Sequence, residues 1–270
     1  MNTNKYPLER KVRVLSLGAG VQSSCLAWLY ETEKLENLPD FAIFADTGAE
    51  PESVYKYLEY LQANIKSFPI YTTSKGNIAL DTILNSRFAT PPFFIKKPNG
   101  KIGMGLRQCT GDYKIKAVQS KIRDVLGYKP RKHMKHKIEV ILGISTDEIE
   151  RMKESRVKWI SNSYPLIDGN FSRTDCLEFI KSIGKRLPPK SACWLCPYRS
   201  NESWLELKDA SPKDFEKAVS FDKFIRNLPK LHHENYLHRS CKPLGEAVLD
   251  IDSDGEKDGI VNECEGMCGT

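Results

Sequence analysis

Two cysteines, Cys193 and Cys196, are separated by two residues, a spacing that lets one turn direct both thiolates toward a metal ion or the edge of a metal cluster. Pro197 follows directly and fits the tight backbone of such a turn. The 8 cysteines of this 270-residue chain are too sparse for a disulfide scaffold. The pair therefore indicates metal or redox chemistry in a reducing compartment, although two thiolates do not complete a site.

A second segment with chemical potential is SLGAGVQSS, over residues 16–24. Small residues let backbone N–H groups approach a phosphate, and the start of a helix favours negative charge. The segment matches neither Gly-x-Gly-x-x-Gly nor the P-loop that ends in Lys-Ser/Thr. It indicates a phosphate-binding turn of another type, and a plain strand-to-helix turn is the alternative.

The elements that must position these residues alternate along the first half of the chain. Apolar runs predict strands over residues 12–17, 41–44, 70–72 and 138–144, and helical periodicity predicts helices over 21–30, over 52–65 and from about Thr146. Strands that alternate with helices form a parallel sheet with both faces covered. Ligands of such sheets lie at the carboxyl ends of the strands, which brings residues 16–24, 46–50 and 143–151 to one edge.

The rest of the chain lacks this alternation of strands and helices. Residues 91–105 are rich in Pro, Gly and Lys and predict a long surface loop that leads into the site. After Arg173 the sequence predicts a mostly helical region. We expect an α/β domain over residues 1–170 and a helical region over residues 171–270 that carries the cysteine motif and packs on the same core.

The composition is that of a globular protein, with 40% hydrophobic and 28% charged residues and a net charge of +6. The longest apolar runs, residues 41–45 and 140–144, fall far short of the roughly 20 residues of a membrane-spanning helix. The first ten residues lack the apolar stretch of a secretory signal. We expect no membrane association and a cytoplasmic location.

Basic residues are concentrated over residues 114–137, where nine lysines and arginines face the single acid Asp124. A small phosphate-bearing ligand needs only a few cations, so this density favours a polymeric or bulky anion. The candidate nucleic-acid contacts are Lys129, Arg131, Lys132, Lys135 and Lys137. A solvated helix face and loop is the alternative, because no RNA- or DNA-reading module accompanies them.

Six segments occur together in one order: residues 16–24, FADTG over 44–48, RQCTGDYKI over 107–115, GISTDEIER over 143–151, YPLID over 164–168 and CWLCP over 193–197. In this combination the chain resembles the phosphoadenosine phosphosulfate (PAPS) reductase-like branch of the adenine nucleotide α-hydrolase, or PP-loop ATP pyrophosphatase, superfamily. The resemblance covers about residues 12–200, and related phage and mobile-element proteins end in a segment similar to residues 262–269. It implies a Rossmann-like parallel-sheet core.

On this resemblance, residues 18–23 correspond to the family's pyrophosphate loop, Ser-Gly-Gly-x-Asp-Ser. Gly18 replaces the Ser, Ala19 replaces a Gly, and Gln22 replaces the Asp that is often linked to Mg²⁺. The geometry for holding phosphate is retained, but the carboxylate is absent. This difference affects the expectation of ATP cleavage more than the expectation of nucleotide binding. The implied nucleotide contacts are Ser16, Gly18, Ala19, Gly20, Gln22, Ser23, Ser24, Asp46, Thr47, Gly48, Gly143, Asp147 and Arg151. Asp46, as a nucleotide-contacting acid, and Arg151, as the cation that opposes phosphate or sulfate, are also implied catalytic residues.

The resemblance also implies a [4Fe–4S] cluster, with a four-thiolate zinc site as the alternative. Cys109 lies in the segment that resembles the cluster-binding region of the sulfonucleotide reductases and is the implied third ligand. The tail supplies the fourth: we expect Cys268 as the ligand and Cys264 as the reactive thiol, and the reverse assignment stays open. The reductases carry adjacent cysteines in the first ligand segment, whereas here Thr110 follows Cys109.

These features lead to one leading hypothesis and two alternatives. The leading one is an iron–sulfur, ATP-dependent enzyme that adenylates an acceptor, releases pyrophosphate and transfers sulfur to nucleic acid or a nucleotide-like substrate. The alternatives are a PAPS or adenylylsulfate reductase that releases sulfite, and a catalytically silent module that binds nucleotide or nucleic acid. The expected partners are ATP or a sulfonucleotide, tRNA or DNA, Mg²⁺, a sulfur or electron donor, and a second copy of the chain in a homo-oligomer.

Overall fold

The computed structural model describes residues 6–84, 91–229 and 233–250. Five parallel strands form the central sheet in the order β3-β2-β1-β6-β7. These strands are β1 (Val12–Leu17), β2 (Phe41–Asp46), β3 (Ile70–Ser74), β6 (Ile138–Leu142) and β7 (Ile160–Ser163). The mixed α/β architecture with a Rossmann-like parallel sheet confirms the predicted fold class. β1, β2, β3 and β6 fall where the apolar runs predicted strands, whereas β7 was not predicted.

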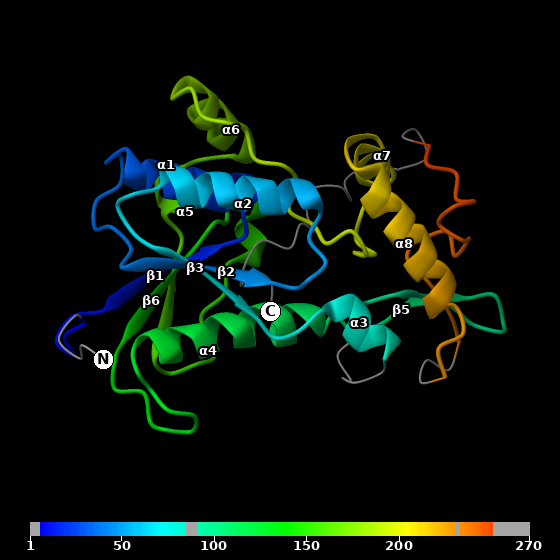
Figure 1. The fold of residues 1–270 in the computed structure, drawn as a ribbon, viewed down its shortest axis with the longest axis horizontal. Coiled ribbons are helices and arrows are strands. Elements are labelled where there is room, and N and C mark those ends of the chain that lie inside the picture. Colours follow the sequence, from blue (N-terminus) through cyan, green and yellow to red (C-terminus); the bar gives the residue numbers. More distant parts are fainter. Residues whose placement is uncertain (1–5, 85–90, 230–232, 251–270) are drawn as a thin grey trace.

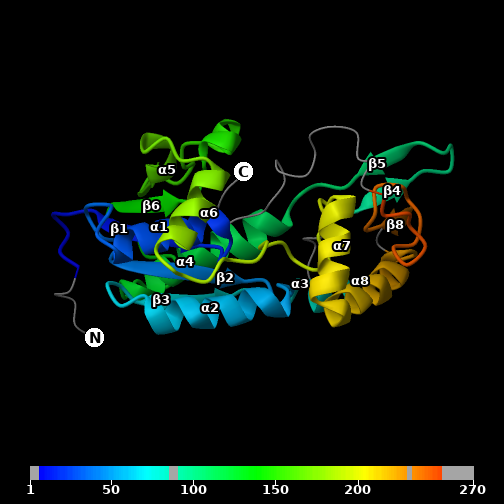
Figure 2. The same cartoon turned by 90° about the horizontal axis from the view of Figure 1, so that it is seen from above.

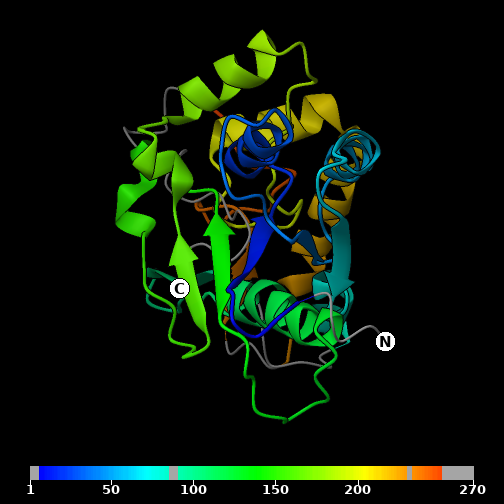
Figure 3. The same ribbon diagram turned by 90° about the vertical axis from the view of Figure 1, so that its left-hand side faces the viewer.

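Helices cover both faces of this sheet (Figures 1 and 3). The helices α1 (Val21–Glu31), α2 (Glu52–Asn64) and α6 (Arg173–Ser182) lie on one face, and α4 (Lys116–Val125) lies on the other. Because both faces are covered, β1 and β2 are almost continuously apolar and buried, as expected of central parallel strands. Short helical segments follow the strands: α5 (Pro165–Asp168), the π-helix η1 (Thr110–Ile115) and the 3₁₀ helix η2 (Thr146–Arg151).

A second lobe lies beside the sheet and is seen on the right in Figures 1 and 2. It contains α3 (Ile78–Ile83), α7 (Asn201–Ala210), α8 (Pro212–Ile225) and a small antiparallel sheet in the order β5-β4-β8. The strands of this sheet are β4 (Phe94–Lys96), β5 (Ile102–Met104) and β8 (Glu234–Tyr236). Its core is aromatic and includes Trp194, Trp204 and Phe221.

The prediction of a long surface loop over residues 91–105 is wrong in part, because β4 and β5 form a hairpin there. Gly100 adopts a φ of +78° at the turn, and the Lys97 N–H donates to the Lys101 carbonyl at 3.0 Å. The signal was in the sequence: Asn99-Gly100 is a strong hairpin turn when apolar residues flank it. The hairpin was missed because the abundance of Pro, Gly and Lys in this segment is also typical of a loop.

Elements from the two halves of the chain mix across residue 170. Helix α6 packs on α1, and β4 pairs with β8. The division into folding units at residues 1–170 and 171–270 stays a prediction. In the part of the chain that the structure describes, every helix is too short or too polar to cross a membrane.

A buried histidine, His238, gives the second lobe an expected pH dependence. Its Nε2–H donates to Asn201 Oδ1 at 2.9 Å, and its Nδ1 accepts from the Ser240 N–H at 3.3 Å, so the ring is held neutral. Burial, and then the neighbouring charge of Arg239, lower the pKa of His238 to about 4. In the unfolded chain a histidine has a pKa of about 6.5.

The stability that neutral His238 contributes should therefore be lost as the pH falls from about 6.5 to about 4, because over this interval the unfolded chain binds a proton that the folded chain does not. We expect the free energy of unfolding to drop by about 1–2 kcal/mol between about pH 7 and about pH 5 from this group alone. Urea unfolding at both pH values measures the drop. The His238→Gln variant should lose less stability over the interval, and an equal loss in both proteins would contradict the assignment.

Candidate functional site

The turn between β1 and α1 is built as a phosphate cradle. The Gly18 N–H donates to Ser23 Oγ at 3.1 Å, which closes residues 18–23 into a ring. Ala19 takes a left-handed φ of +55°, and Gly20 caps α1 in an extended conformation with no side-chain cap. The N–H groups of a first helical turn have no partners within their own helix, so this turn can direct donors at an anion.

Two further predicted contacts flank residues 18–23. The Ser24 N–H donates to the Gly20 carbonyl at 3.1 Å, so this N–H is already bound within the first turn of α1, and the predicted contact of Ser24 with a nucleotide stays a prediction. Ser16 is buried within β1. The structure therefore brings Gly18, Ala19, Gly20, Gln22 and Ser23 together at the carboxyl end of β1, as predicted.

Gly143 fixes the distance between β6 and the cradle. A Cβ atom at this position would lie 2.7 Å from the Ser23 backbone nitrogen and 2.9 Å from its Cα. Only glycine allows this approach, because the atoms in the way are backbone. The cradle thus lies at the carboxyl ends of the paired strands β1 and β6. This is the switch point of the strand order, at which open α/β sheets bind ligands.

Gln22 holds a buried polar network that sequence reasoning missed. Its Nε2 donates to Glu148 Oε2 and to Ser145 Oγ, both at 3.4 Å, and Arg173 NH1 donates to its Oε1 at 3.1 Å. Glu148 is 1% exposed and forms an ion pair with Arg151. Position 22 carries an amide in place of a carboxylate. A buried carboxylate, that of Glu148, lies beside this amide on the segment after β6.

Asp147 makes contacts within the protein, and its predicted role as a nucleotide contact stays a prediction. It is exposed, and its Oδ2 accepts from Ser145 Oγ and from the N–H of Arg173 at the start of α6. It ties the segment after β6 to α6, while Glu148, next in sequence, is the buried acid. The sequence pattern Asp147-Glu148 does not reveal which of the two carboxylates points inward.

Asp46 ends β2, and Thr47 and Gly48 follow it at the same edge of the sheet. Asp46 Oδ1 accepts from the Gly48 N–H and from the Tyr55 hydroxyl, both at 2.7 Å. Burial, with the added effect of Asp46, raises the pKa of Tyr55, so this hydroxyl stays protonated. Gly48 adopts a φ of +69°, which packs the turn against Asn77. Asp46 thus organises the turn, and its predicted nucleotide and catalytic roles stay predictions.

Three cysteines line one small cavity, which we call the thiol cavity. Its walls include Thr47, Cys109, Lys114, Cys193 and Cys196, and it encloses about 30 Å³. The Cys193 thiol lies 3.3 Å from Thr47 Oγ1 and donates to Glu50 Oε1 at 3.4 Å. The structure therefore brings together the three described cysteines of the predicted ligand set.

A buried ion pair sets the electrostatics of the thiol cavity. Lys114 Nζ lies 3.6 Å from Glu50 Oε1, and the two residues are 6% and 4% exposed. Burial, and then the negative charge of Glu50, raise the pKa of the Cys193 thiol, and Lys114 opposes this rise. Without a bound metal, Cys193 is therefore a protonated thiol and a poor nucleophile. The sequence predicted a role for neither Glu50 nor Lys114, although Glu50 lies in the strand-end segment 46–50 and Lys114 in the segment 107–115.

Three thiols and the cation of Lys114 line this cavity, and the thiolate-bound cluster predicted there stays a prediction. A cluster ligated by thiolates is anionic, and the ammonium of Lys114 is a counter-charge beside it. The present volume holds only one or two waters, so binding requires the Cys193 thiol to leave Glu50 and Thr47. Among the described residues, no three His, Cys, Asp or Glu side chains are placed to hold a single metal ion. Cys264 and Cys268 lie outside the described residues.

The cradle and one wall of the thiol cavity follow neighbouring strands. Leu17, the last residue of β1, pairs with Phe44 of β2. The chain passes from β2 into Thr47, which lines the thiol cavity. The cradle and this wall of the cavity are therefore at the same edge of the sheet.

The predicted nucleic-acid contacts lie at the opposite edge of the sheet. Residues 126–137 connect the end of α4 to the start of β6, the green loop at the lower left of Figure 1. The Val12 N–H, at the beginning of β1, donates to the Lys137 carbonyl at 3.0 Å. Lys129, Arg131, Lys132, Lys135 and Lys137 thus flank the amino ends of the strands, and their predicted role in binding nucleic acid stays a prediction.

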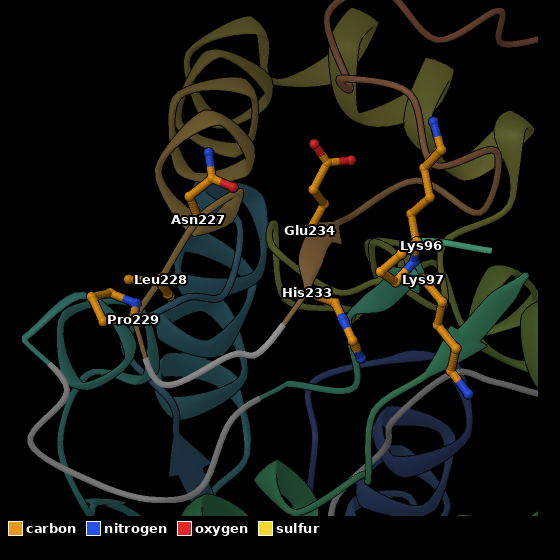
Figure 4. A pocket seen from close by; sticks show the side chains of 8 residues that line it. Lys96, Lys97, Asn227, Leu228, Pro229, His233 and Glu234 are labelled. Carbon is orange, nitrogen blue, oxygen red and sulfur yellow. The ribbon is translucent and has the colours of Figure 1, made fainter. Parts of the chain in front are cut away.

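One cavity lies apart from all of the predicted site residues. It measures about 600 Å³ and lies in the second lobe, where Lys96, Lys97 and His233 surround it with the end of α8 (Figure 4). Its lining comes from the hairpin and from residues 227–229. It is therefore separate from the cradle and from the thiol cavity.

The Gln22 network leads to a sharp prediction. Gln22→Glu keeps the length of the side chain but places a second buried carboxylate beside Glu148 and removes two hydrogen-bond donors. We expect the free energy of unfolding to fall by about 1–3 kcal/mol, as measured by urea unfolding.

Glu148→Gln combined with Gln22→Glu exchanges the amide and the carboxylate. Because the exchanged pair can still form the Nε2–Oε2 hydrogen bond, we expect the double variant to recover about 1 kcal/mol relative to the sum of the single variants. Strict additivity would show that the two side chains do not interact.

Comparison with known proteins adds little to this picture. No protein-family model matches the sequence. No curated protein matches it either. Among solved structures, the fold is similar to a crystal structure of phosphoadenylyl-sulfate (PAPS) reductase from Candida auris in complex with phosphate, with 12% identity, a TM-score of 0.42, and coverage of 68% of this chain and 76% of that chain. The sheet order and the turn after β1 therefore define the protein as a mixed α/β chain with a Rossmann-like core.

Proposed function

We propose that this chain is an ATP-dependent, adenylating sulfur-transfer enzyme that carries an iron–sulfur cluster and acts on nucleic acid or a nucleotide-like substrate. The observation that supports the proposal is that the cradle follows β1 while Thr47, in the wall of the thiol cavity, follows the neighbouring strand β2. A phosphate-binding turn beside thiols suits chemistry in which a nucleotide activates an oxygen and sulfur replaces it. Neither feature alone would indicate this combination.

The proposed reaction has two steps. An acceptor oxygen attacks the α-phosphorus of ATP, and pyrophosphate leaves. Sulfur at the thiol or sulfide level, supplied by a donor, then attacks the acceptor carbon and displaces AMP. The N–H groups of residues 19–23 would bind the departing pyrophosphate, and Arg151 would oppose its charge.

Cys109, Cys193 and Cys196 would hold the cluster, with Cys268 or Cys264 as the fourth ligand. When bound, the cluster would supply sulfur or electrons at this edge of the sheet. Lys114 would offset the negative charge of the cluster. Glu50 would lose the hydrogen bond from the Cys193 thiol and would be able to accept one from another group. A reactive Cys264, a Mg²⁺ ion, a separate sulfur or electron donor and a homo-oligomer belong to the same proposal.

The test is product analysis under anaerobic conditions with α-labelled ATP, a pool of nucleic acid and a source of sulfide. We expect AMP and pyrophosphate to form in step with sulfur incorporation. Sulfite released from a sulfonucleotide without ATP consumption would indicate a PAPS or adenylylsulfate reductase instead. Nucleotide binding with neither reaction would indicate a silent binding module, and ADP with phosphate would contradict adenylation.

A further inference from the structure

A basic groove lies next to the cradle, on the side of β6 and β7. Its part near the cradle is a cavity of about 360 Å³, between Leu142 at the end of β6, Asn162 of β7, and Lys116 at the start of α4. Leu142 directly precedes Gly143, the residue that packs on Ser23 of the cradle. The groove therefore opens beside the switch point of the sheet.

The charge of this groove is strongly positive. Four cations line the cavity and one acid, Glu154, stands among its described lining residues; the cations are Lys116, Arg151, Lys153 and Arg156. Lys116 pairs with Asp112 and Arg151 pairs with Glu148. Within the described chain, Lys153 and Arg156 have no ion-pair partner, and both are exposed. Two cations are thus available to phosphate groups of a ligand.

The groove continues along β7, the edge strand of the sheet. A second cavity, of about 440 Å³, shares Lys153, Glu154, Ser155, Asn162 and Tyr164 with the first. Each volume lies in the range of small-ligand sites and is comparable with one nucleotide. Two such spaces side by side suit consecutive residues of a single strand better than one mononucleotide.

The groove also carries features that suit a base or a sugar. The Asn162 amide donates to the Lys153 carbonyl at 2.8 Å, while its buried Oδ1 has no hydrogen-bond partner among the described residues. A nucleobase amine or a ribose hydroxyl would satisfy this acceptor. The exposed side chain of Met152 adds an apolar surface at the second cavity.

One wall of the groove is already ordered. The Tyr164 hydroxyl donates to the Lys153 carbonyl at 2.5 Å and accepts from the Lys153 N–H at 2.9 Å. This double contact fixes the segment that carries both unpaired cations. A prearranged wall lowers the entropic cost of binding.

We propose that this groove, rather than the basic loop over residues 126–137, binds the phosphodiester backbone of a single-stranded nucleic-acid acceptor. The proposal rests on the proposed function and specifies where its acceptor lies. The basic loop precedes β6, and the five residues of β6 span about 16 Å between the loop and the carboxyl edge. An acceptor held only at the loop would be remote from the cradle, whereas one in the groove lies next to it.

Two charge-reversal variants with the same change in net charge test the proposal. Lys153→Glu/Arg156→Glu alters the groove, and Lys132→Glu/Lys135→Glu alters exposed cations of the loop. Affinity for short fluorescein-labelled RNA and DNA single strands is measured by anisotropy over a series of salt concentrations. We expect the groove variant to bind at least about tenfold more weakly and to lower the salt slope by about 1.4, and the loop variant to change affinity by less than about threefold.

Separate measurements keep this proposal distinct from the proposed function. ATP affinity, measured by titration, should be unchanged in both variants, and its loss in the groove variant would place the groove within the ATP site and overturn the proposal. Equal weakening in both variants, or weakening in the loop variant alone, would also overturn it. Adenosine 3′,5′-bisphosphate should compete poorly with the labelled strands; strong competition that the groove variant abolishes would assign the groove to a small nucleotide instead.

Discussion

Replacing Cys193 by serine is expected to remove the iron, the acid-labile sulfide and the broad visible absorbance of the anaerobically purified protein. A hydroxyl is a poor substitute for a soft thiolate, and Cys193 is the thiol that the structure places against Thr47 and Glu50 at the base of the thiol cavity. Cys196→Ser should have the same effect. Iron, sulfide and absorbance are measured on protein that was never exposed to oxygen.

The control makes the same change at Cys25, which is fully buried in α1 and remote from the cavity lining. Cys25→Ser should keep its iron and sulfide even if its stability falls. Stoichiometric zinc without sulfide in the wild-type protein would contradict the cluster and favour the zinc alternative. Equal loss in the Cys25 and Cys193 variants would mean that the assay reports unfolding.

Gly143→Ala is expected to weaken ATP binding by at least about tenfold and to lower the free energy of unfolding by about 1–3 kcal/mol. The new methyl group would meet backbone atoms of Ser23 at 2.7 and 2.9 Å, and these atoms cannot turn aside as a flexible side chain could. Either β6 or the start of α1 must shift. Both are walls of the cradle, so affinity and stability should fall together.

A matched glycine in the second lobe provides the control. At Gly103 the nearest atom to an added Cβ is Lys97 Cε at 3.7 Å, which is ordinary contact. Gly103→Ala should bind ATP as the wild-type protein does. If Gly143→Ala also binds ATP normally, the nucleotide does not depend on the cradle.

The sequence predicted the central sheet well because its signals are local. Each buried strand is a short apolar run, and parallel order follows from the alternation with helices. The hairpin of β4 and β5 was missed because its strands are only three residues long and its turn residues are also typical of loops. Asn99-Gly100 was the sign that distinguished the two.

The site was predicted in outline and not in its polar contacts. Spacing alone paired Cys193 with Cys196, and Cys109 was added to them by the family resemblance. The buried pairs Gln22 with Glu148 and Glu50 with Lys114 join residues more than sixty positions apart, and no periodicity reports such contacts. Asp147 and Glu148 are chemically alike, so only the course of the 3₁₀ helix decides which one is buried.

The most direct test of this account is a structure of the anaerobically purified protein with a non-hydrolysable ATP analogue. The account predicts the phosphates on the N–H groups of residues 19–23 and the α-phosphate facing the cavity of Cys109, Cys193 and Cys196. A nucleotide bound elsewhere, for example in the cavity of Lys96, Lys97 and His233, would contradict it. A nucleotide on the cradle with its α-phosphate turned away from the thiols would agree with the fold. It would contradict the proposal that the cradle and the thiol cavity form one site.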